Sequence, residues 1–265
     1  MAIVLFGSTL TGCEQVDPLD VVYTNEYEQI TARQLLEGSD EVIRYAKYIS
    51  LEGNTSSSTI AGTAEINSET NKFSANSYYQ DDENYSCVIS GEYVYDSGVS
   101  GIFQPYLNCE CDYYYYEGQA EGQAVDGFHS FKTDHDGHDM RSDSVSIKLR
   151  RILLPDYSNM NMNFYGGNVG SDKQYMITFT GDLSSFNGAF GRMSGAYALT
   201  QVCYYFSVDT HKLVKVTAKG LKTEKKTYAS KDIEWKYEFN AEIKIKEISY
   251  TDHEVCYPSY DVEDF

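Results

Sequence analysis

The sequence lacks the features that would place it in several common classes of protein. It contains no run of about 20 apolar residues, the length that a membrane-spanning helix needs. It has no nucleophile elbow, no HExxH zinc motif, no Walker loop and no GxGxxG fingerprint between a strand and a helix. Positive charge is scarce, because 21 Lys and Arg face 40 Asp and Glu, a net charge of −19 that repels phosphate backbones. We therefore predict a protein that is not an enzyme, needs no cofactor and binds no nucleic acid.

The first thirteen residues combine a short apolar run with a cysteine. The run from Ala2 to Leu10 is too short to span a bilayer but suits the apolar part of a signal peptide. The motif Leu10-Thr11-Gly12-Cys13 that ends it resembles a bacterial lipobox. This resemblance implies a signal peptide over residues 1–12, an acylated (palmitate-bearing) Cys13, and an extracytoplasmic protein anchored to the outer face of the cell membrane. The alternative is a buried first strand followed by a chance Gly-Cys pair.

No Lys or Arg precedes Cys13, although signal peptides begin with positively charged residues. We therefore expect that the native start lies further upstream. After the anchor, residues 13–24 are predicted to form a lipidated tether, with a helical turn near residues 25–30. A single β-rich domain is then expected over residues 25–250, followed by an acidic tail over residues 251–265.

Acylation of Cys13 would leave an odd number of cysteines in the mature chain. The five others are Cys87, Cys109, Cys111, Cys203 and Cys256. They permit at most two disulfides, and their spacing does not show which cysteines pair. Cys109 and Cys111 would share one face of a strand, which suggests a metal clip, but no second CxC or CxxC supplies further ligands. The disulfide pairing stays open.

One segment has convincing helical periodicity. It begins at Thr31, whose hydroxyl can cap the first turn while Gln34 reaches back to it. Its apolar stripe consists of Leu35, Leu36, Val42, Ile43 and Ala46. We predict a helix that packs on a sheet through this stripe.

Most of the remaining sequence alternates as strands do. Four strands are expected over residues 47–55, 59–66, 72–79 and 85–95, with turns at 68–71 and 81–84. A hairpin is expected where Val202, Tyr204, Phe206 and Val208 lead to the turn 209–212 and Val214, Val216 and Ala218 return. The predicted fold class is α+β, mainly antiparallel, with a curved half-barrel sheet packed on an N-terminal helix.

The clearest strand covers residues 233–246, where apolar and polar residues alternate without a fault. Its length exceeds what a compact sandwich needs and suits a strongly curved sheet. The candidates for a ligand-binding cavity are this strand's apolar residues and two from the helix: Trp235, Tyr237, Phe239, Ile243, Ile245, Leu35 and Ile43. The alternative is that the strand residues pack directly on the helix and leave no cavity.

Residues 117–144 are rich in Gly, Asp and His and read as an insertion or long loop. Asp134, His135, Asp136 and His138 are weak candidates for metal ligands, because oxygen and imidazole groups gather there. However, Gly137 directly follows the second acidic position, so the spacing does not fit a calcium loop. A solvated acidic loop is the favoured interpretation.

Two segments carry a wider resemblance. The helix and following strand, TARQLLEGSDEVIRYAKYISLEGN, and the hairpin FSVDTHKLVKV are similar to parts of the lipoprotein-carrier (LolA/LppX-like) half-barrel superfamily. That resemblance covers roughly residues 31–250 and implies a curved sheet folded over a helix, with an apolar cavity for acyl chains. It therefore predicts a membrane-tethered, non-catalytic protein that binds a lipid or another hydrophobic molecule. The alternative is a cell-surface interaction or regulatory protein with a solid core, whose tyrosine-rich face or acidic insertion contacts a protein or a glycan.

Overall fold

In a computed structural model, the described residues are 17–24, 28–81, 84–95, 99–108, 111–120, 123–125, 132–134, 153, 157, 159–169, 172–186 and 198–251. The N-terminal elements are the 3₁₀ helix η1 (Pro18–Asp20), strands β1 (Val22–Thr24) and β2 (Gln29–Thr31), and helix α1 (Ala32–Arg44). Strands β3 (Tyr48–Ala61), β4 (Ala64–Asp81), β5 (Asn84–Tyr95), β6 (Val99–Asn108), β7 (Cys111–Ala120), β8 (Gln123–Val125) and β9 (Lys132–Asp134) follow. The last elements are β10 (Met160–Val169), β11 (Asp172–Gly181), η3 (Ser184–Phe186), β12 (Leu199–Ser207), β13 (Leu213–Tyr228) and β14 (Lys231–Ser249).

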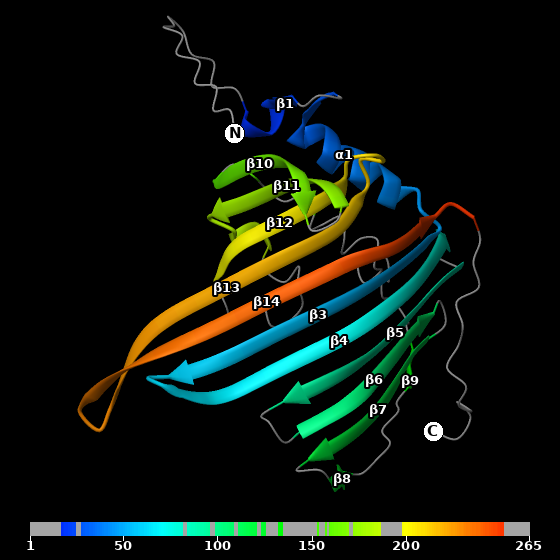
Figure 1. Ribbon diagram of the computed structural model, residues 1–265. Coiled ribbons are helices and arrows are strands. Elements are labelled where there is room, and N and C mark those ends of the chain that lie inside the picture. Colours follow the sequence, from blue (N-terminus) through cyan, green and yellow to red (C-terminus); the bar gives the residue numbers. More distant parts are fainter. Residues whose placement is uncertain are drawn as a thin grey trace, which may run out of the picture.

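Within the described residues, twelve strands form one antiparallel sheet in the order β10-β11-β12-β13-β14-β3-β4-β5-β6-β7-β8, with β9 also on β7. The sheet is strongly twisted and curved, and α1 lies across the end that contains β10 to β13 (Figure 1). The hairpin of β13 and β14 projects from the sheet away from α1, at the lower left. The predicted fold class, mainly antiparallel β with an N-terminal helix, is confirmed.

Helix α1 forms where its sequence predicts it. The Thr31 hydroxyl accepts the Gln34 backbone N–H at 3.2 Å, and the Gln34 side chain accepts the Thr31 backbone N–H at 2.8 Å. This capping box satisfies backbone N–H groups that the first turn leaves unpaired. Of the predicted stripe, Leu35, Leu36, Ile43 and Ala46 are buried, and Val42 is partly buried.

One face of the sheet, called the inner face here, packs on α1. The buried core joins Leu36 and Ile43 of the helix to Phe239 of β14 and to alternate residues of β11, β12 and β13. Register places Ile243, Ala241 and Phe239 of β14 opposite Val216, Ala218 and Gly220 of β13, all on the inner face. The polar residues between them lie on the outer face, as the alternation predicts.

The predicted hairpin over 202–218 is confirmed, with one correction. Tyr205 pairs with Lys215 but Phe206 pairs with Leu213, so a bulge falls at Val214. The extra residue shifts the alternation, and Leu213 is buried while Val214 is partly exposed. The predicted alternation of Val214 with Val216 and Ala218 is therefore wrong at Val214.

The predicted strands over 47–66 and the turn at 68–71 were also wrong in their bounds. β3 continues through 56–58, and 68–71 lie inside β4, paired with 55–58 of β3. The chain reverses at Gly62 instead, whose φ of 63° suits a residue without a Cβ. Residues 56–58 and 68–71 are rich in Ser, Thr and Asn, which are common in turns. Pairing with neighbouring strands nevertheless holds both segments in the sheet.

The residues before α1 contribute ordered elements. The predicted helical turn near 25–30 was wrong for Gln29 and Ile30, which belong to β2 and pair with β1. Residues 17–24, within the predicted tether, form η1 and β1, and Leu19 is 5% exposed. The tether itself stays a prediction.

Parts of the predicted loop 117–144 are strands. Residues 117–120 belong to β7, and β8 and β9 both pair with β7. Their backbone extends the sheet edge, which a composition rich in Gly and Asp did not indicate. The predicted lipobox and the acidic tail from residue 252 lie outside the described residues.

Candidate functional site

The predicted cavity residues fall into two groups along the inner face. Leu35, Ile43 and Phe239 are at most 1% exposed and belong to the closed core. Ile243 and Ile245 are partly exposed and pack against that core. The structure therefore brings these five together. Trp235 and Tyr237 lie further along β14, toward the projecting hairpin.

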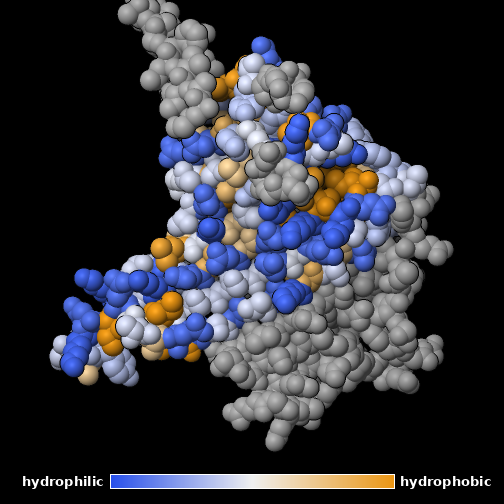
Figure 2. Space-filling view, viewed as in Figure 1, coloured by the Kyte–Doolittle hydropathy of each residue, from blue (hydrophilic) through white to orange (hydrophobic). Residues whose placement is uncertain are grey.

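Small side chains of β3 lie beside this apolar part of β14. Ile243 pairs with Gly53, Ala241 with Thr55, and Phe239 with Ser57. The Phe73 ring of β4 occupies the space where a side chain on Gly53 would stand. Figure 2 shows an apolar area next to the helix-covered part of the sheet, bordered by hydrophilic residues. Partly exposed apolar side chains beside small residues are the features that an elongated hydrophobic ligand requires.

Polar groups on this face bond to each other within the sheet. The Asn71 amide donates to Thr55 Oγ1 at 3.5 Å and to Glu69 Oε1 at 2.8 Å. These side chains already form hydrogen bonds with each other. An apolar ligand that covers them would therefore break few hydrogen bonds to water without replacement.

Trp235 and Tyr237 form an aromatic cluster with charged residues of β13. Their rings stack with centroids 6.4 Å apart, and Lys226 Nζ lies 4.6 Å from the Trp235 ring centre. Lys226 Nζ also lies 2.7 Å from Glu224 Oε1 and 2.7 Å from the Tyr237 hydroxyl. The bonds that Glu224 accepts from Lys226 and Tyr237 lower the pKa of this carboxyl to about 2. Glu224 is therefore ionised at neutral pH.

A second, polar site lies at the turn between β12 and β13. Glu28 Oε1 accepts hydrogen bonds from the hydroxyl of fully buried Tyr175 and, at 2.9 Å, from His211 Nε2. The Tyr175 hydroxyl, followed by His211, lowers the pKa of Glu28 below its ordinary value. His211 has a φ of 57°, a left-handed conformation that places its ring toward Glu28.

This polar site borders a pocket of about 380 Å³ lined by Glu28, Lys173, Val208, Asp209 and His211. The described residues contain no group of three or more His, Cys, Asp or Glu side chains arranged to hold a metal ion. The arrangement fastens the hairpin turn to the segment before β2. Sequence reasoning found the turn but not Glu28, which lies 183 residues before His211 and has no local motif.

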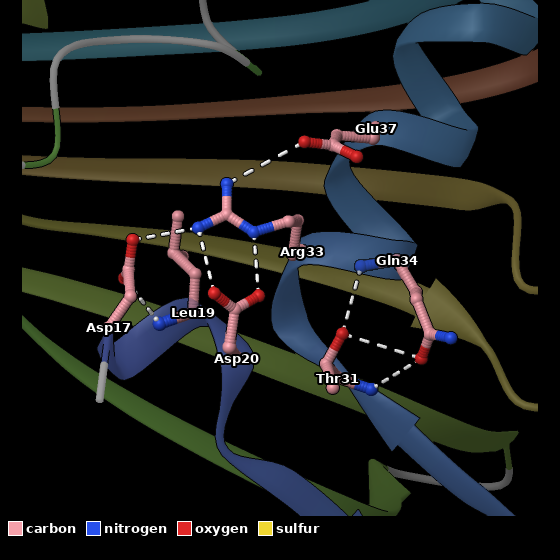
Figure 3. Close-up of polar contacts among 7 residues, drawn as sticks. All are labelled: Asp17, Leu19, Asp20, Thr31, Arg33, Gln34 and Glu37. Atoms are coloured by element: carbon pink, nitrogen blue, oxygen red, sulfur yellow. Dashed lines mark hydrogen bonds and ion pairs between the residues drawn. The ribbon is translucent and has the colours of Figure 1, made fainter. Parts of the chain in front are cut away.

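A third polar cluster ties η1 to α1 (Figure 3). The Arg33 guanidinium lies 2.6 Å from Asp20, 2.7 Å from Asp17 and 3.6 Å from Glu37. The Asp17 side chain also accepts the Leu19 backbone N–H at 2.9 Å. These bonds hold the start of the described chain against the first turn of α1.

Several predicted residues lie outside the described part of the chain. These are Cys13, Cys109, His135, Asp136, His138 and Cys256; Asp134 ends β9. Of the cysteines whose side chains are described, Cys203 is a free, buried thiol 3.3 Å from Thr178 Oγ1. In the described residues, no helix has both the length and the apolar character to cross a membrane.

Comparisons with known proteins concern the arrangement of the backbone. LprF from Mycobacterium bovis is 9% identical with a TM-score of 0.47, over 83% of this chain and 94% of that one. A DUF1329 family protein from Desulfovibrio piger is 13% identical with a TM-score of 0.25, over 82% of this chain and 90% of that one. An outer membrane lipoprotein-sorting protein domain from Vibrio parahaemolyticus is 10% identical with a TM-score of 0.23, over 80% of this chain and 92% of that one.

No family model and no curated protein sequence matches the chain. The similarity to LprF and to the lipoprotein-sorting domain concerns the arrangement of the backbone alone.

Proposed function

We propose that this chain is a membrane-tethered, extracytoplasmic lipoprotein that binds an acyl chain or another hydrophobic ligand on its inner face, without catalysis. The observation that carries the proposal is the apolar stripe of β14 beyond the closed core, where Ile243 and Ile245 stay partly exposed beside Gly53 and Phe73. Each methylene group removed from water contributes about 0.8 kcal/mol, so a short acyl segment on this stripe would give useful affinity. Binding would be reversible burial, with no covalent step.

Ligand binding is tested in the full chain with Cys13→Ser, which removes the predicted acylation site. Native mass spectrometry would detect co-purified lipid, and titration with a fluorescent fatty acid would give a Kd. Ile243→Ala should weaken binding several-fold, because it shortens the apolar stripe. Ile60→Ala is the matched control, since Ile60 is also partly exposed but lies on the outer face. Absence of lipid and of probe binding, or equal effects of the two variants, would overturn the proposal.

Tethering is a separate part of the proposal and rests on the lipobox resemblance of Leu10 to Cys13. It is tested by expressing the native reading frame and separating membrane from soluble fractions. The wild-type protein should stay with the membrane and carry acyl groups on Cys13, whereas Cys13→Ser should become soluble. An unmodified Cys13 in a membrane-bound wild type would contradict it.

A second function is favoured by one observation, the tight packing between α1 and the sheet. Leu35, Leu36 and Phe239 are each 1% exposed, as expected of a solid core. This would suit a surface interaction or regulatory protein that binds a protein or glycan. The fatty-acid titration separates the two functions, because a solid-core protein would bind no probe at any concentration.

A further inference from the structure

The tip of the β13–β14 hairpin, residues 219–238, differs in charge from the rest of the molecule. On its inner face register places Lys222, Lys226 and Lys231 with a single acid, Glu224, a net charge of +2. The outer face carries three lysines and three acids, which balance: Lys219, Lys225, Lys236, Asp232, Glu234 and Glu238. In a chain of net charge −19, this small cationic face stands out.

Aromatic and apolar side chains alternate with these lysines on the same face. Trp235 and Tyr237 stack on each other, Ile233 pairs with Lys226, and Tyr228, 76% exposed, lies next to the turn. At the tip in Figure 2, hydrophobic and hydrophilic residues lie side by side. Trp and Tyr concentrate where a bilayer meets water, and lysines there place their charge among the headgroups while their stems stay in apolar surroundings.

The lysines are accessible to an outside anion. The side chains of Lys222 and Lys226 are 50% and 48% exposed although both approach Glu224. One glutamate cannot neutralise three lysines, so positive charge remains for a partner. The hairpin also projects from the sheet at the end away from η1 and α1, so the folded core does not cover it (Figure 1).

We propose that the inner face of this hairpin tip docks on an anionic phospholipid surface. The cationic charge attracts the headgroups, and Tyr228, Trp235 and Ile233 enter the interface between headgroups and acyl chains. This proposal does not depend on ligand binding near Ile243, because it uses different residues and a different kind of contact. Since η1 lies at the opposite end of the sheet, the hairpin tip and the start of the described chain are at two separate ends of the molecule (Figure 1).

The test is co-sedimentation with vesicles, using the full chain with Cys13→Ser as the common background. Vesicles contain either phosphatidylcholine alone or phosphatidylcholine with phosphatidylglycerol. The parent should bind the anionic vesicles and bind them less tightly in about 0.5 M salt, because the Debye length falls to a few ångströms. Replacing Lys222, Lys226 and Lys231 together with Gln should lower the partition coefficient about tenfold or more, since a lysine near an anionic surface contributes about 1 kcal/mol.

The matched control replaces Lys219, Lys225 and Lys236 with Gln, which removes the same charge from the same strands on the outer face. It should leave the partition coefficient within about twofold of the parent. Circular dichroism melts verify that both triple variants fold. Failure of the parent to bind anionic vesicles, or equal losses in both triple variants, would overturn the proposal. Tyr228→Ser should give a smaller, salt-independent loss of binding. An unchanged partition coefficient in this variant would contradict the proposed contact between Tyr228 and the bilayer.

Discussion

Strand β14 passes through two regions that differ in what lies against its inner face. Near Phe239 and Ala241 it is covered by the core beneath α1, and both residues are nearly inaccessible to water. Near Ile233 and Trp235 the same alternation continues, but lysines of β13 lie beside the apolar side chains. A single sequence pattern therefore serves a closed core at one end and an amphipathic surface at the other.

The difference between the two regions predicts unequal costs of truncation. Phe239→Ala should lower the free energy of unfolding by about 3–5 kcal/mol, because it leaves a cavity in a closed core. Trp235→Ala should cost about 1 kcal/mol, since the partly exposed ring loses only part of its packing. Urea unfolding followed by circular dichroism measures both. Similar losses would show that the hairpin tip is as tightly packed as the core.

The helix-covered end also contains the bond between Glu28 and buried Tyr175. Glu28→Gln should lower stability by about 1–3 kcal/mol, because a charged acceptor is lost from a buried hydroxyl. The pKa of Glu28 is lowered in the fold, so its contribution is present above the ordinary pKa of a glutamate and is lost as pH falls through the folded value. The stability difference between wild type and Glu28→Gln should therefore shrink below pH ~4. A difference that grows on acidification would contradict this sign.

Substitutions in the turn at the hairpin tip are expected to raise the stability of the protein, unlike those above. Ala229 and Ser230 have φ values of 48° and 65°, although neither is glycine. Asn and Gly tolerate such values best, so Ala229→Asn with Ser230→Gly should stabilise the protein by about 0.5–1 kcal/mol. Thermal melts measure the gain. No change would indicate that the tip opens well before the core unfolds.

The smallest effect is expected at the cluster that ties η1 to α1. Arg33→Ala should lower global stability by at most about 1 kcal/mol, because the ion pairs with Asp17 and Asp20 are exposed. Hydrogen exchange should nevertheless accelerate at the Leu19 and Val21 amides, whose bonds hold η1 in place. Arg44→Ala, which breaks an ion pair at the other end of α1, is the control and should leave these amides unchanged.

The elements that were predicted well have local physical causes. Thr31 and Gln34 satisfy each other within one turn, and the alternation of β14 needs only its own residues. The errors arose where neighbours decided the outcome. Residues 68–71 resemble a turn in composition but lie inside β4, and a bulge at Val214 interrupts the predicted alternation.

The candidate sites follow the same division. Phe239, Ile243 and Trp235 were all selected from one alternating strand, but nothing in the alternation says where the covering helix ends. Glu28 and His211 could not be paired in advance, because long-range contacts have no signature in a single sequence.

By itself, the sequence determined the class of fold, the helix start, the face of β14 that turns inward and the excess of negative charge. These follow from capping, alternation and composition, which act over a few residues at a time. Only the tertiary structure decided which part of that inner face is closed by α1, which part remains partly open, and which carries lysines beside aromatic rings. Those outcomes depend on strand register and on the position of the helix, both of which join residues far apart in the chain.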